Sequence, residues 1–227
     1  MSLKNYIKNR KVDHFNVSGI EVFVKDPLPI EINVSTVIKS FVSRVPKHLL
    51  GNLDVIYIGS FPELEDRDLQ AMYQNSSIFV TNNQASESDM IDDLIHETAH
   101  SVEETYGELI YSDKSIEKEY TQKMKDLWFT LKDEGYRIDL SYFLDPEYDE
   151  EFDKFLYAQV GYPTLSLMTT NLFFSPYAAT SLSEYFANGF ESFFMRENID
   201  RLKKISPRLY KKLIQLLNFQ NKEANLS

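Results

Sequence analysis

Two histidines four residues apart, His96 and His100, stand in the segment DLIHETAHSV, and Glu97 directly follows the first of them. An α-helix turns by about 100° per residue, so both imidazole rings would leave the same face one turn apart. Neutral imidazole binds zinc, and a catalytic zinc site uses three protein ligands and leaves one position for water. A glutamate beside the first ligand can take a proton from that water. The segment predicts two metal ligands and a general base, although two surface histidines would show the same spacing.

A third ligand must come from another part of the chain. The sequence has no cysteine, so only histidine, aspartate or glutamate can supply it. We interpret the remaining histidines, His14 and His48, as surface or ordinary core residues. A carboxylate is the better candidate, and Glu184 offers one.

Glu184 lies in a segment, residues 175–195, whose pattern predicts an amphipathic helix. Glu184, Asn188 and Glu191 share one face of this helix, at spacings of four and seven residues. The packing around them is aromatic: Tyr185, Phe186, Phe190, Phe193 and Phe194. A polar stripe in so apolar a helix needs partners, unless it is simply the solvent-facing side of a surface helix.

Three blocks of the sequence together resemble the catalytic domain of anthrax lethal factor and the related Pro-Pro endopeptidases. They are HETAHSVEETYG, then YAATSLSEYFANGFESFF with Tyr177 seven residues before Glu184, then ENIDRLKKISPRLYKKLIQLL. The resemblance covers residues 90–107 and 175–217. Three blocks in the same order are more specific than one five-residue motif.

The resemblance implies a role for each candidate residue. Zn²⁺ would be held by His96, His100 and Glu184. Glu97 would be the general base, and Tyr177 would stabilise the oxyanion. Asn188 stands where lethal factor has an acidic residue, and it can accept a hydrogen bond from a ligand histidine less strongly than a carboxylate would.

The chain also departs from the family, because the interval between His100 and Glu184 is longer than the resemblance leads us to expect. We interpret residues 112–165 as an insertion. It contains a helix predicted over residues 114–135 and an acidic stretch, DPEYDEEFD, over residues 145–153. That stretch lacks the spacing of a calcium loop, and we interpret it as a solvated loop, which either lines a cleft or is only part of the surface.

Charge restricts the partners that the chain can have. The net charge is -11, and residues 51–195 carry 8 Lys and Arg against 28 Asp and Glu. An anionic middle argues against nucleic acid and favours metal ions or basic peptides, although solvated helix faces would look the same. No apolar run is long enough for a membrane span, and the N-terminus lacks the apolar region of a signal peptide. We therefore expect a soluble protein, cytoplasmic by default and secreted if a leader was removed; the oligomeric state is left open.

The elements that must position these residues follow from hydrophobic periodicity. Strands are predicted at residues 19–24, 53–59 and 76–82. A first helix should begin at a Ser35 cap, and the motif helix should run over residues 89–107 and end at Gly107.

The predicted fold is an α+β zincin-like catalytic domain spanning residues 1–227. A lobe of residues 1–107 would hold a small mixed sheet and the motif helix, and a mainly helical lobe of residues 108–227 would carry the third ligand. The predicted function is zinc-dependent cleavage of a protein or peptide substrate, with the substrate extended along an exposed sheet edge at residues 76–82. The alternative is a catalytically silent zincin scaffold, either a peptide-binding module or a metal-stabilised part of a toxin or phage assembly.

Overall fold

A computed structural model describes residues 13–196 and 198–219, and it confirms the α+β class. The chain divides into two compact units, residues 1–105 and 106–227, which are described one at a time. The prediction that the N-terminus is no signal peptide depends on residues 1–12, outside the described part. Among the described helices, none combines the length and the apolar character needed to cross a bilayer.

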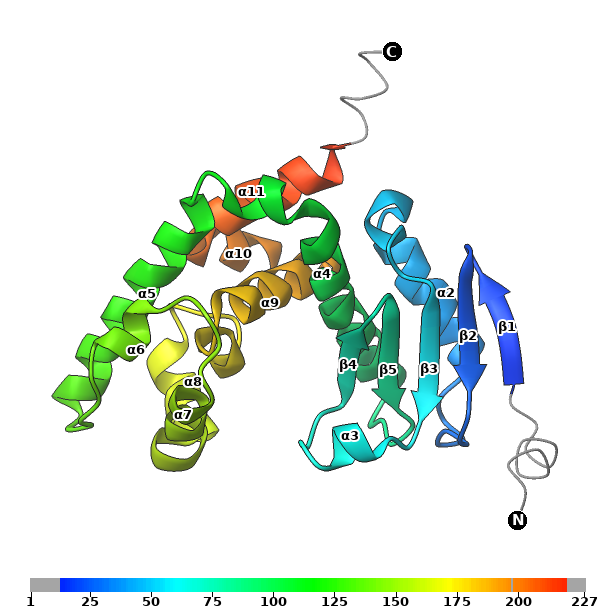
Figure 1. Ribbon diagram of the computed structural model, residues 1–227, viewed down its shortest axis with the longest axis horizontal. Helices are drawn as coiled ribbons and strands as arrows, with labels where there is room; N and C mark the ends of the chain where they lie inside the picture. Colours follow the sequence, from blue (N-terminus) through cyan, green and yellow to red (C-terminus); the bar gives the residue numbers. More distant parts are fainter. Residues whose placement is uncertain (1–12, 197, 220–227) are drawn as a thin grey trace. The chain divides into compact units, whose positions relative to one another are not determined.

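The first unit is built on a five-stranded mixed sheet with the strand order β1-β2-β3-β5-β4 (Figure 1). Its strands are β1 (Asp13–Val17), β2 (Ile20–Val24), β3 (Val55–Gly59), β4 (Ala71–Gln74) and β5 (Ser77–Thr81). The pairs β2/β3 and β3/β5 are parallel, and the two outer pairs are antiparallel. The three predicted strands are confirmed as β2, β3 and β5, whereas β1 and β4 were not predicted.

The position of β5 corrects one expectation. Residues 76–82 were predicted to form an exposed edge for substrate, but β5 lies between β3 and β4 and pairs with both. Its backbone groups are therefore used within the sheet. In the described sheet the edges belong to β1 and β4.

One face of the sheet is buried under helices. The strands alternate, so that Ile56, Ile58 and Ile78 point to the buried side and are completely buried. The helices of this unit are α2 (Val34–Arg44), η1 (Lys47–Leu50), α3 (Pro62–Glu65) and α4 (Glu87–Tyr111). Figure 1 shows α2 and the N-terminal part of α4 behind the sheet. Burial of this apolar layer is the main stabilising contribution to the unit.

Both predicted helix boundaries in this region are wrong by a few residues. The N-cap of α2 is Asn33, whose side chain accepts a hydrogen bond from the Thr36 backbone N–H at 3.1 Å, so the helix starts before Ser35. Helix α4 passes through Gly107 and ends at Tyr111. A helical glycine costs only about 1 kcal/mol, and the fully buried Ile110 holds the last turn in place.

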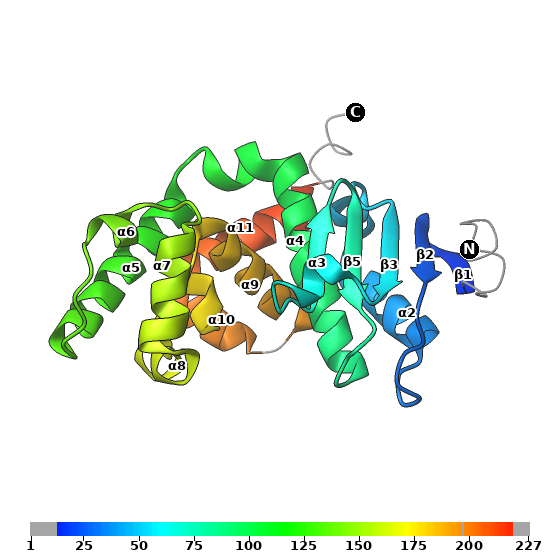
Figure 2. The same cartoon turned by 60° about the horizontal axis from the view of Figure 1, so that its bottom comes forward.

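The second unit is helical. Its elements after α4 are α5 (Ser115–Asp133), α6 (Ser141–Leu144), α7 (Glu150–Lys154), the π-helix η2 (Phe155–Val160), α8 (Tyr162–Thr169), the 3₁₀-helix η3 (Pro176–Ala179), α9 (Leu182–Met195), α10 (Ile199–Ile205) and α11 (Pro207–Leu217). Figure 2 shows the short α7 and α8 next to each other, joined through η2. The predicted helix over residues 114–135 is confirmed as α5.

The helix predicted over residues 175–195 is two elements rather than one. The backbone is extended at Ser181, with φ of -160°, and this separates η3 from α9. The Ser181 hydroxyl accepts a hydrogen bond from the backbone N–H of Glu184 at 3.1 Å, as an N-cap does. The capping side chain explains the break, because serine in this position satisfies an N–H group that a new helix leaves unpaired.

Helices α9 and α11 approach each other closely at Gly189. A Cβ atom at this position would lie 2.2 Å from Cδ2 of Leu209, which is fully buried. Glu119 of α5 fixes the start of α11, since its carboxylate accepts the backbone N–H groups of Arg208 and Leu209 at 2.9 and 3.1 Å. Leu209 therefore has little room to give way.

Two glycine-to-alanine variants should change stability in opposite directions. Gly189→Ala should lower the free energy of unfolding by about 1–2 kcal/mol, because overpacking exceeds the gain in helix propensity. Gly107→Ala is the matched control: a Cβ there meets nothing within 4 Å, and the variant should gain about 0.5–1 kcal/mol. Urea unfolding of both variants measures the difference, and equal stabilities would contradict the packing described for α9 and α11.

Lys123 is a buried cation in the second unit. Its ammonium group donates to the backbone carbonyls of Leu172 and Ile205, the latter at 2.6 Å, and lies 5.5 Å from the ring centres of Phe173 and Tyr185. Burial lowers the pKa of Lys123 to about 8, from an ordinary value of 10.5. The folded state therefore holds this proton less tightly than the unfolded state does.

Stability should consequently rise with pH between about 8 and 10.5. In this window Lys123 is deprotonated when folded and protonated when unfolded, so the unfolded state binds more protons. The slope from one proton is at most about 1.4 kcal/mol per pH unit. The difference in unfolding free energy between wild type and Lys123→Met, followed from pH 7 to 9.5, isolates this contribution. A difference that does not change with pH would rule out the shifted lysine.

Candidate metal centre

The two motif histidines lie on α4 as the spacing predicts. The ring centres of His96 and His100 are 5.5 Å apart with an interplanar angle of 72°. The opposite stripe of α4 is buried, with Leu94 and Ile95 fully inaccessible to solvent. Because a helix cannot rotate without exposing this stripe, burial of the apolar side fixes the direction in which both imidazoles point.

Glu103 orients one of these rings, and the sequence analysis missed it. His100 Nδ1 lies 2.9 Å from Glu103 Oε2, one turn along the helix, and the two side chains are only 22% and 15% exposed. A carboxylate at this position favours the tautomer with the proton on Nδ1, which leaves the Nε2 lone pair to bind a metal ion. An acid three residues after a candidate ligand histidine is the signal that would have found it.

Glu97 is held by the edge strand of the sheet. Its Oε2 accepts the backbone N–H of Tyr73 in β4 at 2.7 Å. A second hydrogen bond joins the same strand to α4, since the Tyr73 hydroxyl donates to Glu104 at 2.7 Å. Asn52 also donates to Glu104, at 2.8 Å. Burial, followed by the hydrogen bond to Glu104, raises the pKa of Tyr73, so this phenol stays protonated and the tie persists above neutral pH.

In the second unit, Glu184 lies in the first turn of α9 and Tyr177 lies on η3. Burial, followed by the negative charge of Glu184, raises the pKa of Tyr177 well above its usual range. The phenol is therefore a hydrogen-bond donor at any physiological pH. The extended residue Ser181 between the two elements sets their relative direction.

Asn188 fastens α9 to η3. It is buried, and its Oδ1 accepts a hydrogen bond from the hydroxyl of Ser175, the residue that caps η3. This partner was not predicted. The role of Asn188 as an acceptor from a ligand histidine stays a prediction.

Among the described residues, one group of three His, Asp or Glu side chains could hold a metal ion: His96, His100 and Glu184. One ligand atom from each lies within 4.8 Å of those of the other two, and all three side chains are half-buried. Two imidazoles and one carboxylate are a donor set that suits zinc, whose tetrahedral ligands lie about 3.3 Å apart. The residue types therefore fit the ion that the motif implies, and the 4.8 Å limit on the separation of their ligand atoms is wider than the spacing in a zinc site.

The other two histidines, His14 and His48, lie in the first unit and are not part of this group. His14 in β1 pairs with the Glu21 side chain and stacks on Phe23 with 4.4 Å between ring centres. His48 lies half-buried in η1. Their interpretation as surface or ordinary core residues agrees with these positions.

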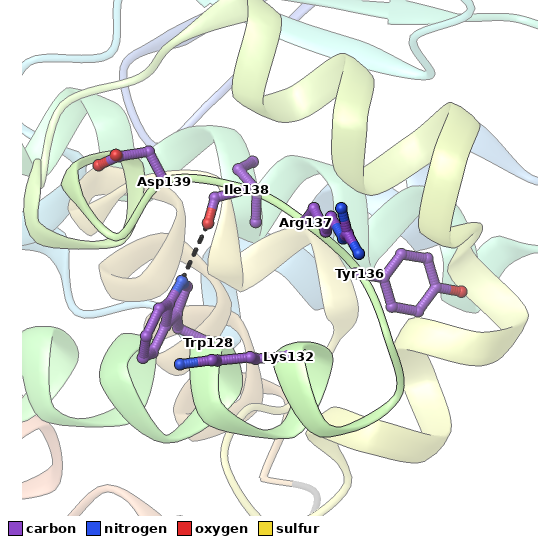
Figure 3. Close-up of a pocket in the computed structure, with 6 residues that line it drawn as sticks. All are labelled: Trp128, Lys132, Tyr136, Arg137, Ile138 and Asp139. Carbon is purple, nitrogen blue, oxygen red and sulfur yellow. Dashed lines mark hydrogen bonds between the residues drawn. The ribbon is translucent and has the colours of Figure 1, made fainter.

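A cavity of about 400 Å³ lies in the second unit, between the end of α5 and the segment that follows it (Figure 3). Its lining residues are Trp128, Lys132, Tyr136, Arg137, Ile138 and Asp139. Trp128 donates its indole N–H to the Ile138 carbonyl at 3.1 Å, and the Lys132 ammonium lies over the indole ring. These contacts explain how the segment is held against α5, and no predicted site residue lines the cavity.

Comparison with known proteins adds no assignment, because no family model, no curated protein and no solved structure matches the chain. The chemistry must be argued from the site itself.

Loss of the Glu103 carboxylate should weaken metal binding without unfolding the protein. Glu103→Ala removes the partner of His100 Nδ1, and removal of such partners typically lowers metal affinity by about 10- to 100-fold. Glu108→Ala is the control, since Glu108 is an exposed acid on the same helix. Competition titrations with a chromogenic zinc chelator measure both affinities. Equal affinities in the two variants would show that Glu103 does not orient a ligand.

Proposed function

We propose that this protein is a zinc-dependent endopeptidase with a zincin-like catalytic domain similar to that of lethal factor. The observation that carries the proposal is the group formed by His96, His100 and Glu184, with Glu97 next to the first ligand on the same helix. Two imidazoles, one carboxylate and an adjacent carboxylate that is not a ligand are the parts that metal-assisted hydrolysis needs.

His96, His100 and Glu184 would hold the ion. When bound, zinc supplies Lewis acidity, which polarises a carbonyl group and makes water a stronger acid. Glu97 takes the proton of the attacking water on its carboxylate and later passes it to the leaving amine. The hydrogen bond from the Tyr73 N–H holds this carboxylate in one orientation, so Glu97 does not have to be ordered when substrate arrives.

Tyr177 is proposed to stabilise the oxyanion. Its raised pKa keeps the hydroxyl proton in place, so the phenol can donate a hydrogen bond to an oxygen that becomes negatively charged. The hydrogen bond from the Ser175 hydroxyl to Asn188 stabilises η3, the 3₁₀-helix that carries Tyr177. One such donor contributes about 3 kcal/mol to transition-state stabilisation in other hydrolases.

Zinc content tests the ligand assignment. The purified protein should bind one zinc ion, and His100→Ala and Glu184→Ala should each lose it, because each removes one of three protein ligands. Elemental analysis after dialysis against metal-free buffer gives the stoichiometry. Circular dichroism verifies that the variants are folded. A full equivalent of zinc retained in both variants would refute the site.

Glu97→Gln separates metal binding from catalysis. The variant is nearly isosteric and should keep its zinc and its fold, while kcat for a peptide library should fall by about 10²- to 10⁴-fold, as expected when a general base is lost. Cleavage is followed by mass spectrometry with and without a chelator. Near wild-type activity of the variant would exclude the mechanism. Zinc binding by a wild-type protein that cleaves nothing would favour the silent or structural scaffold instead.

A further inference from the structure

The acidic stretch of residues 145–153 is not uniform. Most of its carboxylates are exposed, and two of them serve local turns: Asp149 caps α7, and Asp145 accepts the backbone N–H of Glu147. Asp153 differs, because it lies half-buried within α7. The interpretation of the whole stretch as a solvated loop is therefore wrong for residues 150–153, which lie in α7, and burial sets Asp153 apart from the exposed acids among them.

The Asp153 carboxylate has one satisfied oxygen and one unsatisfied oxygen. Oδ2 accepts a hydrogen bond from the Tyr148 hydroxyl at 2.9 Å. Oδ1 is inaccessible to solvent and, within the described part of the chain, has no hydrogen-bond partner. A shielded carboxylate oxygen without a donor is unfavourable, so this atom is a place where a ligand's donor would be stabilised.

Three tyrosines lie near this carboxylate in the sequence, and the hydroxyl of one of them, Tyr148, is hydrogen-bonded to it. Tyr148 is 50% exposed and Tyr157 is 63% exposed, which is unusual for side chains of this size. The Tyr157 ring meets the ring of Tyr162 edge to face, with 5.6 Å between their centres. Burial, followed by the charge of Asp153, raises the pKa of Tyr162 to about 12, so its phenol stays neutral beside the carboxylate.

The same carboxylate lies close to one residue of the proposed catalytic centre, Tyr177. Tyr177 is subject to the negative charges of both Glu184 and Asp153, and Tyr162 is subject to the same two charges. The helices agree with this proximity, since α8, which begins at Tyr162, packs against η3, which carries Tyr177.

We propose that Asp153, with the rings of Tyr148, Tyr157 and Tyr162, forms a subsite for a lysine or arginine side chain of the peptide substrate, next to the scissile bond. The proposal rests on the proposed endopeptidase function. A carboxylate pairs with an ammonium or guanidinium group, and aromatic faces attract the same cations. The rings of Tyr148 and Tyr157 are exposed, so a cation can reach them from solvent. Rotation of the Tyr148 ring would open the Asp153 carboxylate, to which its hydroxyl donates, to the same cation.

A metal ion is a poorer occupant of this subsite. Hard cations need several oxygen ligands, typically six or more for calcium, and phenols that stay protonated are weak ligands. The group formed by His96, His100 and Glu184 is the one place in the described residues with three metal-ligand side chains. An organic cation with a long apolar stem matches one carboxylate and three rings better.

Paired peptides test the subsite. Each pair is identical except for lysine or its neutral isostere norleucine, placed in turn at each of the four positions around the cleaved bond. At one position the wild type should prefer lysine by about tenfold in kcat/KM, and Asp153→Asn should reduce this ratio to about 1. Glu150→Gln removes the same charge from an exposed residue three positions earlier and should keep the ratio. Tyr157→Leu should lower it about two- to fivefold, since it removes one aromatic face.

The outcomes separate this inference from the proposed function. A wild type that cleaves both peptides of every pair equally well overturns the subsite and leaves the endopeptidase intact, as does an unchanged ratio in Asp153→Asn. If no peptide is cleaved, the proposed endopeptidase function is wrong. The subsite is then tested by binding: fluorescence polarisation measures whether Glu97→Gln binds the lysine peptide more tightly than the norleucine peptide. Equal affinities there would also overturn it.

Discussion

The candidate centre depends on one constraint, the rotational phase of helix α4. The helix buries Leu94 and Ile95 completely, and this burial decides where every other residue of the helix points. The directions in which His96, His100 and Glu103 leave the helix are therefore fixed by this burial. A substitution that shifts the apolar stripe would turn the whole set away at once, whereas a substitution on the exposed side would affect only its own residue.

The elements that were predicted correctly are those whose apolar periodicity can be seen within the element itself. The strands β2, β3 and β5 and the helices α4 and α5 have clear periodicity, and all of them are present. β4 has only four residues, and its identity as a strand comes from pairing with β5, which no local pattern records. The break at Ser181 was missed for a related reason: the aromatic periodicity continues across it, and only the cap geometry shows that Tyr177 and Glu184 belong to different elements.

The site residues also divide into those that a local sequence pattern predicts and those that it does not. The types and spacing of His96, Glu97 and His100 are enough to suggest metal chemistry, because one helical turn brings them together. The partners that orient them could not be inferred with equal ease. The backbone N–H that holds Glu97 comes from Tyr73, twenty-four residues earlier in the sequence. In the sequence, Asp153 is one of several acidic residues in a row, and its charge does not distinguish it from them. Only its burial in the structure does.

The contact between Glu97 and β4 also bears on self-association. β4 is an outer strand, and the unpaired N–H groups of such strands can recruit a strand from another molecule, which starts aggregation. The Tyr73 N–H is already occupied by a carboxylate, and a negative charge at this position repels an incoming backbone carbonyl. The residue proposed for proton transfer thus also occupies a backbone donor through which this edge of the sheet could otherwise recruit another strand.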